Sequence, residues 1–233
     1  MMPDGDTLYI FFTPDVKVPV EKQVIDGVTG IYVSKKVNNE WTEPERVMLQ
    51  DKGKLALDGC EFVQGDTMLF CSAREGYTGI HWFTAELKDG KWQGWKNADF
   101  KPEYEVGELH IYNDELYFHS SRPGGEGGLD IWVSKNVNGE WGEPKNVEPV
   151  NSERNEGWPF VSQDGSELWI SKDYVLWRSK KIDNEWTKPE LMISPLTGEA
   201  SLDNEGNVYF THHFFKGDEM IEADIYIAEK VKP

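Results

Sequence analysis

Short runs in which apolar and polar residues alternate recur from one end of the chain to the other. Alternation with a period of two is typical of half-buried β-strands, and no useful stretch has the longer period of an amphipathic helix. The runs come in five pairs, at residues 7–11 and 30–34, 68–71 and 79–83, 116–119 and 130–134, 168–171 and 176–179, and 208–211 and 224–228. The pattern predicts an all-β protein.

One turn motif repeats and sets the length of the repeat. A Glu-Trp-x-x-Pro segment follows a tight turn at residues 37–44, 137–144 and 182–189, and a looser copy lies at 87–95. The Asn-Asn, Asn-Gly, Asp-Asn and Asp-Gly pairs favour the positive φ angles of two-residue hairpins. The motif tryptophans are Trp41, Trp92, Trp141 and Trp186. Since they recur with the turns, we interpret them as packing residues and not as ligand platforms.

Innermost strands are expected near residues 59–64, 107–112, 157–162 and 198–203, each followed by a tight turn. Four short strands per repeat indicate propeller blades. We therefore predict a single domain, residues 1–233, that forms a five-bladed β-propeller of four-stranded antiparallel blades. The blades are expected at about 1–50, 55–100, 104–148, 153–193 and 196–233. The first copy lacks an innermost strand and the last lacks an outermost one, which leaves either two three-stranded blades or a start inside a longer gene product.

Two segments resemble a known repeat family. Residues 156–168 (Glu-Gly-Trp-Pro-Phe-Val-Ser-Gln-Asp-Gly-Ser-Glu-Leu) and residues 120–132 resemble the TolB-type propeller repeats, which are WD-like repeats of bacterial and archaeal proteins. The resemblance implies a propeller fold and leaves binding, scaffolding and catalysis open. It also implies a periplasmic or extracellular location, although we find no signal peptide.

The charge narrows the class of partner. The formal net charge is −18, with 42 acidic against 24 basic residues. Phosphate backbones would be repelled, so we expect no nucleic-acid partner. No apolar run is long enough for a membrane helix, so no membrane insertion is expected. A small polar ligand, a carbohydrate or a protein segment fits better, and we expect a monomer.

The two cysteines form no metal-binding or disulfide-framework pattern. If Gly65-Asp66 is a two-residue turn, Cys60 and Cys71 face each other in a hydrogen-bonded pair. A disulfide and two buried thiols are both consistent with that placement.

The loops single out one face of the predicted propeller. Those at residues 13–29, 72–78, 120–129, 172–174 and 212–223 vary in length and chemistry, and they share a face with the beginnings of the innermost strands, beside the central channel. The candidate ligand-binding residues on or near this face are Asp58, Arg74, Tyr77, Glu105, His110, His119, Arg122, Arg154, Glu156, Trp158, Lys172 and His212. Trp158 and Tyr77 are the candidates for stacking on a ligand.

Our leading hypothesis is a non-catalytic binding protein or scaffold, because no catalytic motif is present. The alternative is a glycoside hydrolase or lyase in which Glu108, Glu199 and His213 do acid–base work. A third hypothesis is a metal-dependent hydrolase. We expect no organic cofactor. A divalent cation such as calcium is the one candidate cofactor, with Glu126 and Asp130 as ligands.

Overall fold

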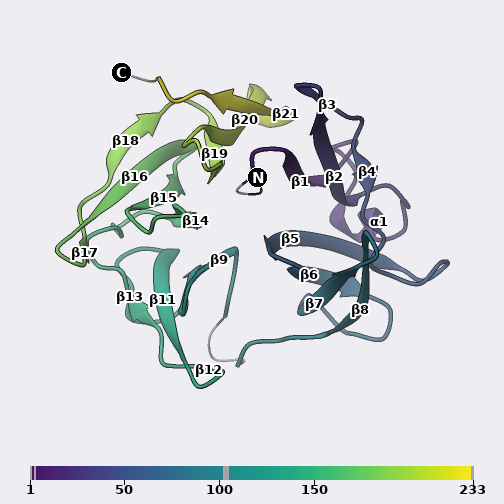
Figure 1. Cartoon of the computed structure of the whole chain (residues 1–233), viewed down its shortest axis with the longest axis horizontal. Coiled ribbons are helices and arrows are strands. Elements are labelled where there is room, and N and C mark those ends of the chain that lie inside the picture. Colours follow the sequence, from purple (N-terminus) through teal and green to yellow (C-terminus); the bar gives the residue numbers. More distant parts are fainter. Residues whose placement is uncertain (1, 3, 102–104, 232–233) are drawn as a thin grey trace. The chain divides into compact units, whose positions relative to one another are not determined.

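The computed structural model describes residue 2, residues 4–101 and residues 105–231. The turn predicted at residues 3–5 and the blade predicted from residue 104 each begin at a residue outside this set. The described chain folds into five antiparallel sheets, and the predicted class, an all-β five-bladed propeller, is confirmed (Figure 1). The sheets fall into two compact units, Met1–Phe100 and Lys101–Pro233.

The first unit holds two sheets. Blade one contains β1 (Thr7–Phe12), β2 (Gly30–Val37), β3 (Glu40–Trp41) and β4 (Glu45–Arg46), where β1, β3 and β4 all pair with β2. Blade two contains β5 (Ala56–Gln64), β6 (Thr67–Arg74), β7 (His81–Lys88) and β8 (Lys91–Asn97), paired in chain order. Blade one lacks an innermost strand among its described residues, as predicted.

The second unit holds three sheets. Blade three contains β9 (Leu109–Tyr112), β10 (Glu115–Ser120), β11 (Asp130–Val137), β12 (Glu140–Trp141) and β13 (Lys145–Asn146). Blade four contains β14 (Glu156–Val161), β15 (Glu167–Lys172), β16 (Val175–Ile182), β17 (Glu185–Trp186) and β18 (Glu190–Ile193). Blade five contains β19 (Thr197–Leu202), β20 (Val208–Lys216) and β21 (Glu219–Ala228), and it has no outermost strand among the described residues.

A buried serine organises the outer edge of three blades. Proline has no N–H to donate to a ladder, so the Glu-Trp-x-x-Pro motif splits the outer strand into two short pieces. A serine hydroxyl of the third strand donates to the carbonyl two residues before the proline. The pairs are Ser34 with Thr42, Ser134 with Gly142, and Ser179 with Thr187. Blade two has no proline at this position, and its outer strand β8 is continuous.

Apolar clusters fill the space between neighbouring blades of each unit. Blades one and two share Ile31, Val47, Leu49, Met68, Phe70, Phe83 and Ala85. Blades three and four share Tyr117, Ile131, Val147, Val150, Val161, Leu168 and Ile170. The motif tryptophans Trp92 and Trp186 pack edge-on against Tyr9 and Tyr117 of the preceding blade, as the packing interpretation predicts.

The structure departs from the sequence prediction in two elements. A single helical turn, α1 (Val20–Gln23), forms in the long loop of blade one, where Lys22 and Gln23 donate to the Pro19 carbonyl. The loop predicted at 212–223 is wrong, because β20 and β21 continue as one long hairpin to a turn at Gly217. The alternating residues on both arms keep the ladder paired. No helix of the described residues has the length and apolar character needed to cross a membrane.

Candidate functional site

Three of the innermost strands, β5, β14 and β19, carry a β-bulge at matching positions. The ladder register shifts between Gly59 and Phe62 in β5, between Gly157 and Phe160 in β14, and between Gly198 and Ser201 in β19. The residue after the glycine is left-handed each time, with φ of 53° at Cys60, 51° at Trp158 and 58° at Glu199. A non-glycine residue in this region costs roughly 1–3 kcal/mol and is often found at functional sites. The three bulge residues are therefore candidates for a functional role.

The glycine before each bulge residue allows a ring of another strand to approach closely, from the preceding blade at Gly59 and Gly157 and from within blade five at Gly198. A Cβ built on Gly59 would lie 3.0 Å from the Phe11 ring, and one on Gly157 would lie 3.2 Å from His119 Nδ1. A Cβ on Gly198 would lie 3.3 Å from the His213 ring. Gly59 and Gly157 are thus needed for close packing between blades, and Gly198 for close packing within blade five.

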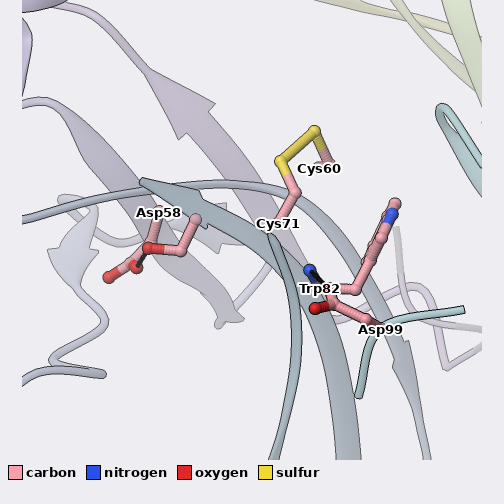
Figure 2. Close-up of a disulfide and its surroundings, with 6 residues drawn as sticks. Asp58, Cys60, Cys71, Trp82 and Asp99 are labelled. Carbon is pink, nitrogen blue, oxygen red and sulfur yellow. Dashed lines mark hydrogen bonds between the residues drawn. A yellow bond between two sulfur atoms is a disulfide. The ribbon is translucent and has the colours of Figure 1, made fainter. Parts of the chain in front are cut away.

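In blade two the bulge position holds a disulfide. Cys60 and Cys71 are bonded, with a Cα–Cα distance of 5.4 Å, and Figure 2 shows the bond joining β5 to β6. The prediction that the two cysteines lie directly opposite each other is wrong, because Cys71 pairs with Gly59 and Cys60 lies in the bulge. Of the two states left open by the sequence, the structure has the disulfide.

Two candidate residues of blade two are committed to the blade itself. Arg74 and Asp58 are both buried and form an ion pair of 2.6 Å, while Ser72 bonds to both. The Arg74 guanidinium also lies 4.5 Å from the centre of the Phe83 ring, in cation–π contact. These contacts explain the pair without a ligand. Tyr77 packs its ring against His81 and Phe83 and is 37% exposed.

A depression of about 740 Å³ opens in blade four, on the face where the predicted loops lie. Its walls come from the link before β14 and from the β15–β16 turn. The lining residues are Ser152, Glu153, Arg154, Lys172, Asp173 and Trp177. The candidates Glu156 and Lys172 meet at its base, where β14 pairs with β15 and Lys172 Nζ lies 3.5 Å from Glu156 Oε1.

The charges at the depression are arranged as compensated pairs. Glu156 is fully buried, and its carboxylate accepts from the Ser152 hydroxyl and the Ser152 N–H as well as facing Lys172. Arg154 bonds to Asp173 at 2.7 Å near the rim, where both side chains are largely exposed. The depression therefore offers donors and acceptors without a large net charge.

One donor at the depression remains unused. The Trp177 indole Nε1 is buried and has no hydrogen-bond partner among the residues that the structure describes. The Lys172 ammonium lies 4.5 Å from the centre of the Trp177 ring, in cation–π contact. A buried N–H without an acceptor costs about 1–3 kcal/mol, so an acceptor group that reached this N–H would be stabilised.

A second group of candidates lies along the inner strands of blades three to five. Trp158 is 39% exposed, and its main-chain N–H donates to His119 Nδ1 at 3.3 Å. His119 N–H donates to the carbonyl of Glu108 at 3.2 Å. Glu199 is exposed, and its N–H donates to Ser171 Oγ at 2.9 Å. Trp158 of β14 and Glu199 of β19 thus lie on neighbouring strands, and Glu108 immediately precedes β9, which also contacts β14.

Burial keeps the imidazoles of blade three neutral. Desolvation lowers the pKa of His119 to about 4. Desolvation also lowers the pKa of His110 to about 3, and the His110 ring packs 4.6 Å from that of Phe160. Since neutral His119 accepts at Nδ1, its proton sits on Nε2.

His212 and His213 lie inside β20 and not at a strand end, which corrects the prediction. They pair with Asp224 and Ala223, so their side chains point to opposite faces of the sheet. His213 Nδ1 bonds to the Leu196 carbonyl, and its ring packs against Tyr174. His212 packs against Phe214 and Tyr226. The geometry separates the two imidazoles.

The remaining candidates are placed apart from these groups. Arg122 stacks over Trp132. Glu105 is exposed and precedes β9. The Asp130 carboxylate is buried and accepts from the N–H groups of Glu126 and Gly127, so it organises the glycine-rich loop. No group of three or more His, Cys, Asp or Glu side chains suited to a metal occurs among residues 4–101 and 105–231.

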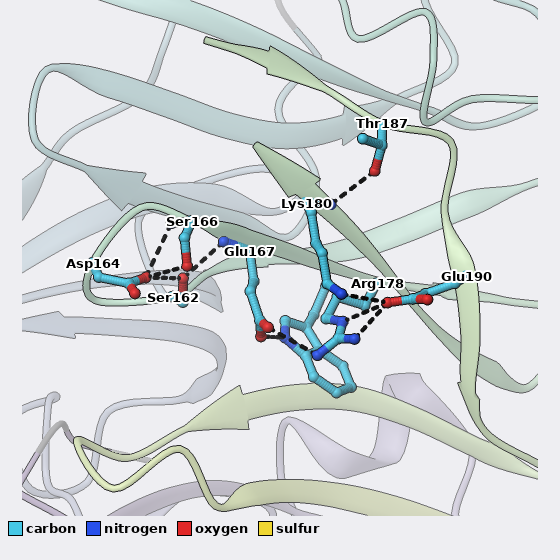
Figure 3. Close-up of polar contacts among 9 residues, drawn as sticks. Ser162, Asp164, Ser166, Glu167, Arg178, Lys180, Thr187 and Glu190 are labelled. Atoms are coloured by element: carbon cyan, nitrogen blue, oxygen red, sulfur yellow. Dashed lines mark hydrogen bonds and ion pairs between the residues drawn. The ribbon is translucent and has the colours of Figure 1, made fainter. Parts of the chain in front are cut away.

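A polar network on the outer side of blade four has a structural role. Figure 3 shows Arg178 between Glu167 and Glu190, and Asp164 bonded to Ser162 and Ser166. Hydrogen bonds from the two serines and from the Ser166 N–H lower the Asp164 pKa. This network fixes the turn at residues 164–165, as predicted for a purely structural connection.

Sequence reasoning passed over Ser152, Asp173 and Trp177 as site residues. The sequence identifies Trp177 only as a strand residue, because its position fits the period-two alternation of apolar and polar residues. The signal that could have found them is positional: Ser152 lies in a blade-to-blade link and Asp173 in a variable turn, and both connections belong to the predicted functional face.

The class that the fold defines is the β-propeller, and comparison with known proteins adds distant structural neighbours. No known protein family matches the chain, and neither does any curated protein. A gluconolactonase from Xanthomonas campestris is 12% identical with a TM-score of 0.46, over 77% of this chain and 64% of that one. A puromycin-hydrolyzing peptidase from Mycobacterium tuberculosis is 9% identical with a TM-score of 0.44, over 93% and 38%.

The third neighbour is a Bacteroides ovatus protein described as xyloglucan PUL GH43B. It is 13% identical with a TM-score of 0.48, over 85% of this chain and 46% of that one. This chain therefore spans between 38% and 64% of the length of these three proteins.

Proposed function

We propose that this propeller is a binding protein for a small, neutral, hydroxyl-rich ligand such as a saccharide, held in the depression of blade four. The observation that carries the proposal is that Trp177 lines the depression while its buried Nε1–H has no acceptor among the described residues. A ligand hydroxyl or carbonyl would supply that acceptor. Pockets of this size commonly hold small ligands through a few convergent polar groups.

The charges favour a neutral ligand over an ionic one. Lys172 is balanced by buried Glu156, and Arg154 by Asp173, so neither cation is free to neutralise an anion without breaking a pair. Hydroxyl groups both donate and accept, which suits the mixed carboxylates, amines and indole around the depression. The molecule's net charge of −18 further disfavours an anionic ligand.

The test uses the Trp177 indole itself. In a ¹⁵N–¹H spectrum, a panel of mono- and disaccharides should shift the Trp177 Nε1–H resonance, which is assigned by its loss in Trp177→Phe. That variant keeps an aromatic ring and removes the N–H, so affinity should fall about tenfold, the value of one neutral hydrogen bond.

Trp132→Phe is the matched control. Trp132 occupies the corresponding position in β11, and its buried Nε1 also lacks a partner among the described residues, but it does not line the depression. Binding should survive this change. If no saccharide moves the Trp177 resonance, or if both variants lose affinity equally, the proposal fails.

The glycoside hydrolase alternative stays a prediction. Glu108 immediately precedes β9 of blade three and Glu199 lies on β19 of blade five, and β14 of blade four contacts both β9 and β19. The Glu199 carboxylate accepts from Thr211 Oγ1 at 2.9 Å. Turnover of a glycoside panel that is lost in both Glu108→Gln and Glu199→Gln would favour the hydrolase over the binding protein.

A further inference from the structure

The exposed tryptophan at the bulge of β14 is a second place where a ligand can bind, separate from the depression. Trp158 holds a large aromatic side chain at φ 51° and is 39% exposed. A bulky residue is an outlier in this region of backbone space, and its ring here does not enter a core cluster. Packing alone therefore gives little reason for tryptophan at this position.

The surroundings fix the backbone of Trp158. Its N–H is held by His119 Nδ1, whose ring centre lies 5.4 Å from that of the indole, and Gly157 allows this approach. Pro159 follows, and a proline is tolerated because β14 is an edge strand with a bulge. The indole is thus presented from a preformed backbone and not from a loop.

Two acidic residues flank Trp158 at neighbouring backbone positions. Glu199 holds the same bulge position on the neighbouring strand β19, and its N–H bonds to Ser171, which pairs directly with Gly157. Glu108 precedes β9 on the other side, where its carbonyl accepts from His119. Because the pKa of His119 is lowered to about 4, this imidazole adds no positive charge near pH 7.

An aromatic face beside carboxylates attracts one kind of group above others. Cations bind over the face of tryptophan by about 0.5–2 kcal/mol, and nearby carboxylates add Coulomb attraction. The field of a molecule with net charge −18 raises the local concentration of cations. The carboxylates and the net negative charge both disfavour anionic ligands.

We propose that Trp158, together with Glu199, binds the ammonium group of a cationic ligand. The site is independent of the depression in blade four, since Trp158 and Glu199 do not line it. We expect the site to prefer a cationic ligand over a neutral ligand of the same shape.

A pair of probes with one shape isolates the charge. Choline carries a trimethylammonium group, and its neutral carbon isostere carries a tert-butyl group instead. Choline should shift the Trp158 indole resonance with a dissociation constant at least about tenfold lower than that of the isostere. Trp158→Ala should abolish this response, and Glu199→Gln should weaken choline binding several-fold without changing binding of the isostere.

Two controls keep the test decisive. Glu222→Gln removes an exposed carboxylate of β21 and should leave choline binding unchanged. Trp177→Phe changes the depression and leaves Trp158 in place, so choline should still shift the Trp158 resonance in this variant. If Trp158→Ala does not fold, the Glu199→Gln variant still decides. Equal binding of choline and its isostere, no response of Trp158, or an unchanged affinity in Glu199→Gln would each overturn the proposal.

Discussion

Cys60, Trp158 and Glu199 occupy one backbone position in three blades and carry three different kinds of chemistry. Each follows a glycine, adopts a positive φ and interrupts the ladder of an innermost strand. In blade two the position is closed by a disulfide, and in blades four and five it presents an indole and a carboxylate. The repeat thus supplies the backbone geometry of the bulge, and the side chain at that position determines its chemistry.

At the same scale, His119 links stability to pH. Its folded pKa of about 4 lies below the ordinary value near 6.5, so protonation favours the unfolded chain. The stability contributed by neutral His119 is complete above pH 6.5 and is lost as the pH falls to about 4. A shift of this size corresponds to roughly 3 kcal/mol. Urea unfolding at several pH values should show this loss, and it should be smaller in His119→Asn.

His81 gives a control of opposite sign. A hydrogen bond to Asp99 and a second to the Thr78 carbonyl raise the pKa of His81. Its contribution is therefore present below the unfolded pKa and lost as the pH rises through the folded one. His81→Asn should remove stability mainly at low pH. If His119→Asn and His81→Asn changed the pH profile in the same direction, the burial argument for His119 would be contradicted.

At the scale of the element, the Cys60–Cys71 bond ties β5 to β6 across a bulge. The two residues are 11 apart in sequence, and closing a loop of about that length stabilises a folded chain by about 3 kcal/mol in the chain-entropy description. The double variant Cys60→Ser/Cys71→Ser should therefore unfold at lower urea, with a loss of about 2–3 kcal/mol. Wild type and variant should converge in reducing buffer. A difference that persists under reduction would point to packing instead.

Strands were more predictable than their defects. Trp41, Trp141 and Trp186 revealed the repeat because each blade needs the same hairpin and the same proline-broken outer strand. The bulges were missed because they depend on how a neighbouring blade approaches a glycine such as Gly157. The loop predicted around His213 was wrong for a related reason, since a lone histidine pair says little about whether a ladder continues.

The sequence could indicate on which face of the propeller a site would lie, but not which residues would form it. The link and turn that line the depression are connections of the predicted functional face, and Lys172 and Glu156 are among the candidate residues, which stay predictions. Asp58 and Arg74 were also candidates, yet they satisfy each other inside blade two. Charge type alone cannot separate a buried ion pair from a ligand contact, because the separation depends on tertiary burial.

At the scale of the whole molecule, the prediction of one domain has a direct thermodynamic consequence. A single cooperative domain unfolds in one transition whose calorimetric and van't Hoff enthalpies agree. Residues Met1–Phe100 and Lys101–Pro233 form separate compact units by their internal contacts. Scanning calorimetry of the full chain therefore tests the single-domain prediction, and two resolved transitions would contradict it.

The net charge of −18 makes a final prediction in which stability and ligand binding respond to salt in opposite directions. Self-repulsion among excess carboxylates disfavours the compact state, and salt screens it as the Debye length falls from about 30 Å at 0.01 M to about 8 Å at 0.15 M. The melting temperature should rise over this range. Choline binding at Trp158 should weaken over the same range, because the attraction that favours it is screened as well. A melting temperature that falls with salt would show that surface ion pairs such as Arg154–Asp173 outweigh the excess charge.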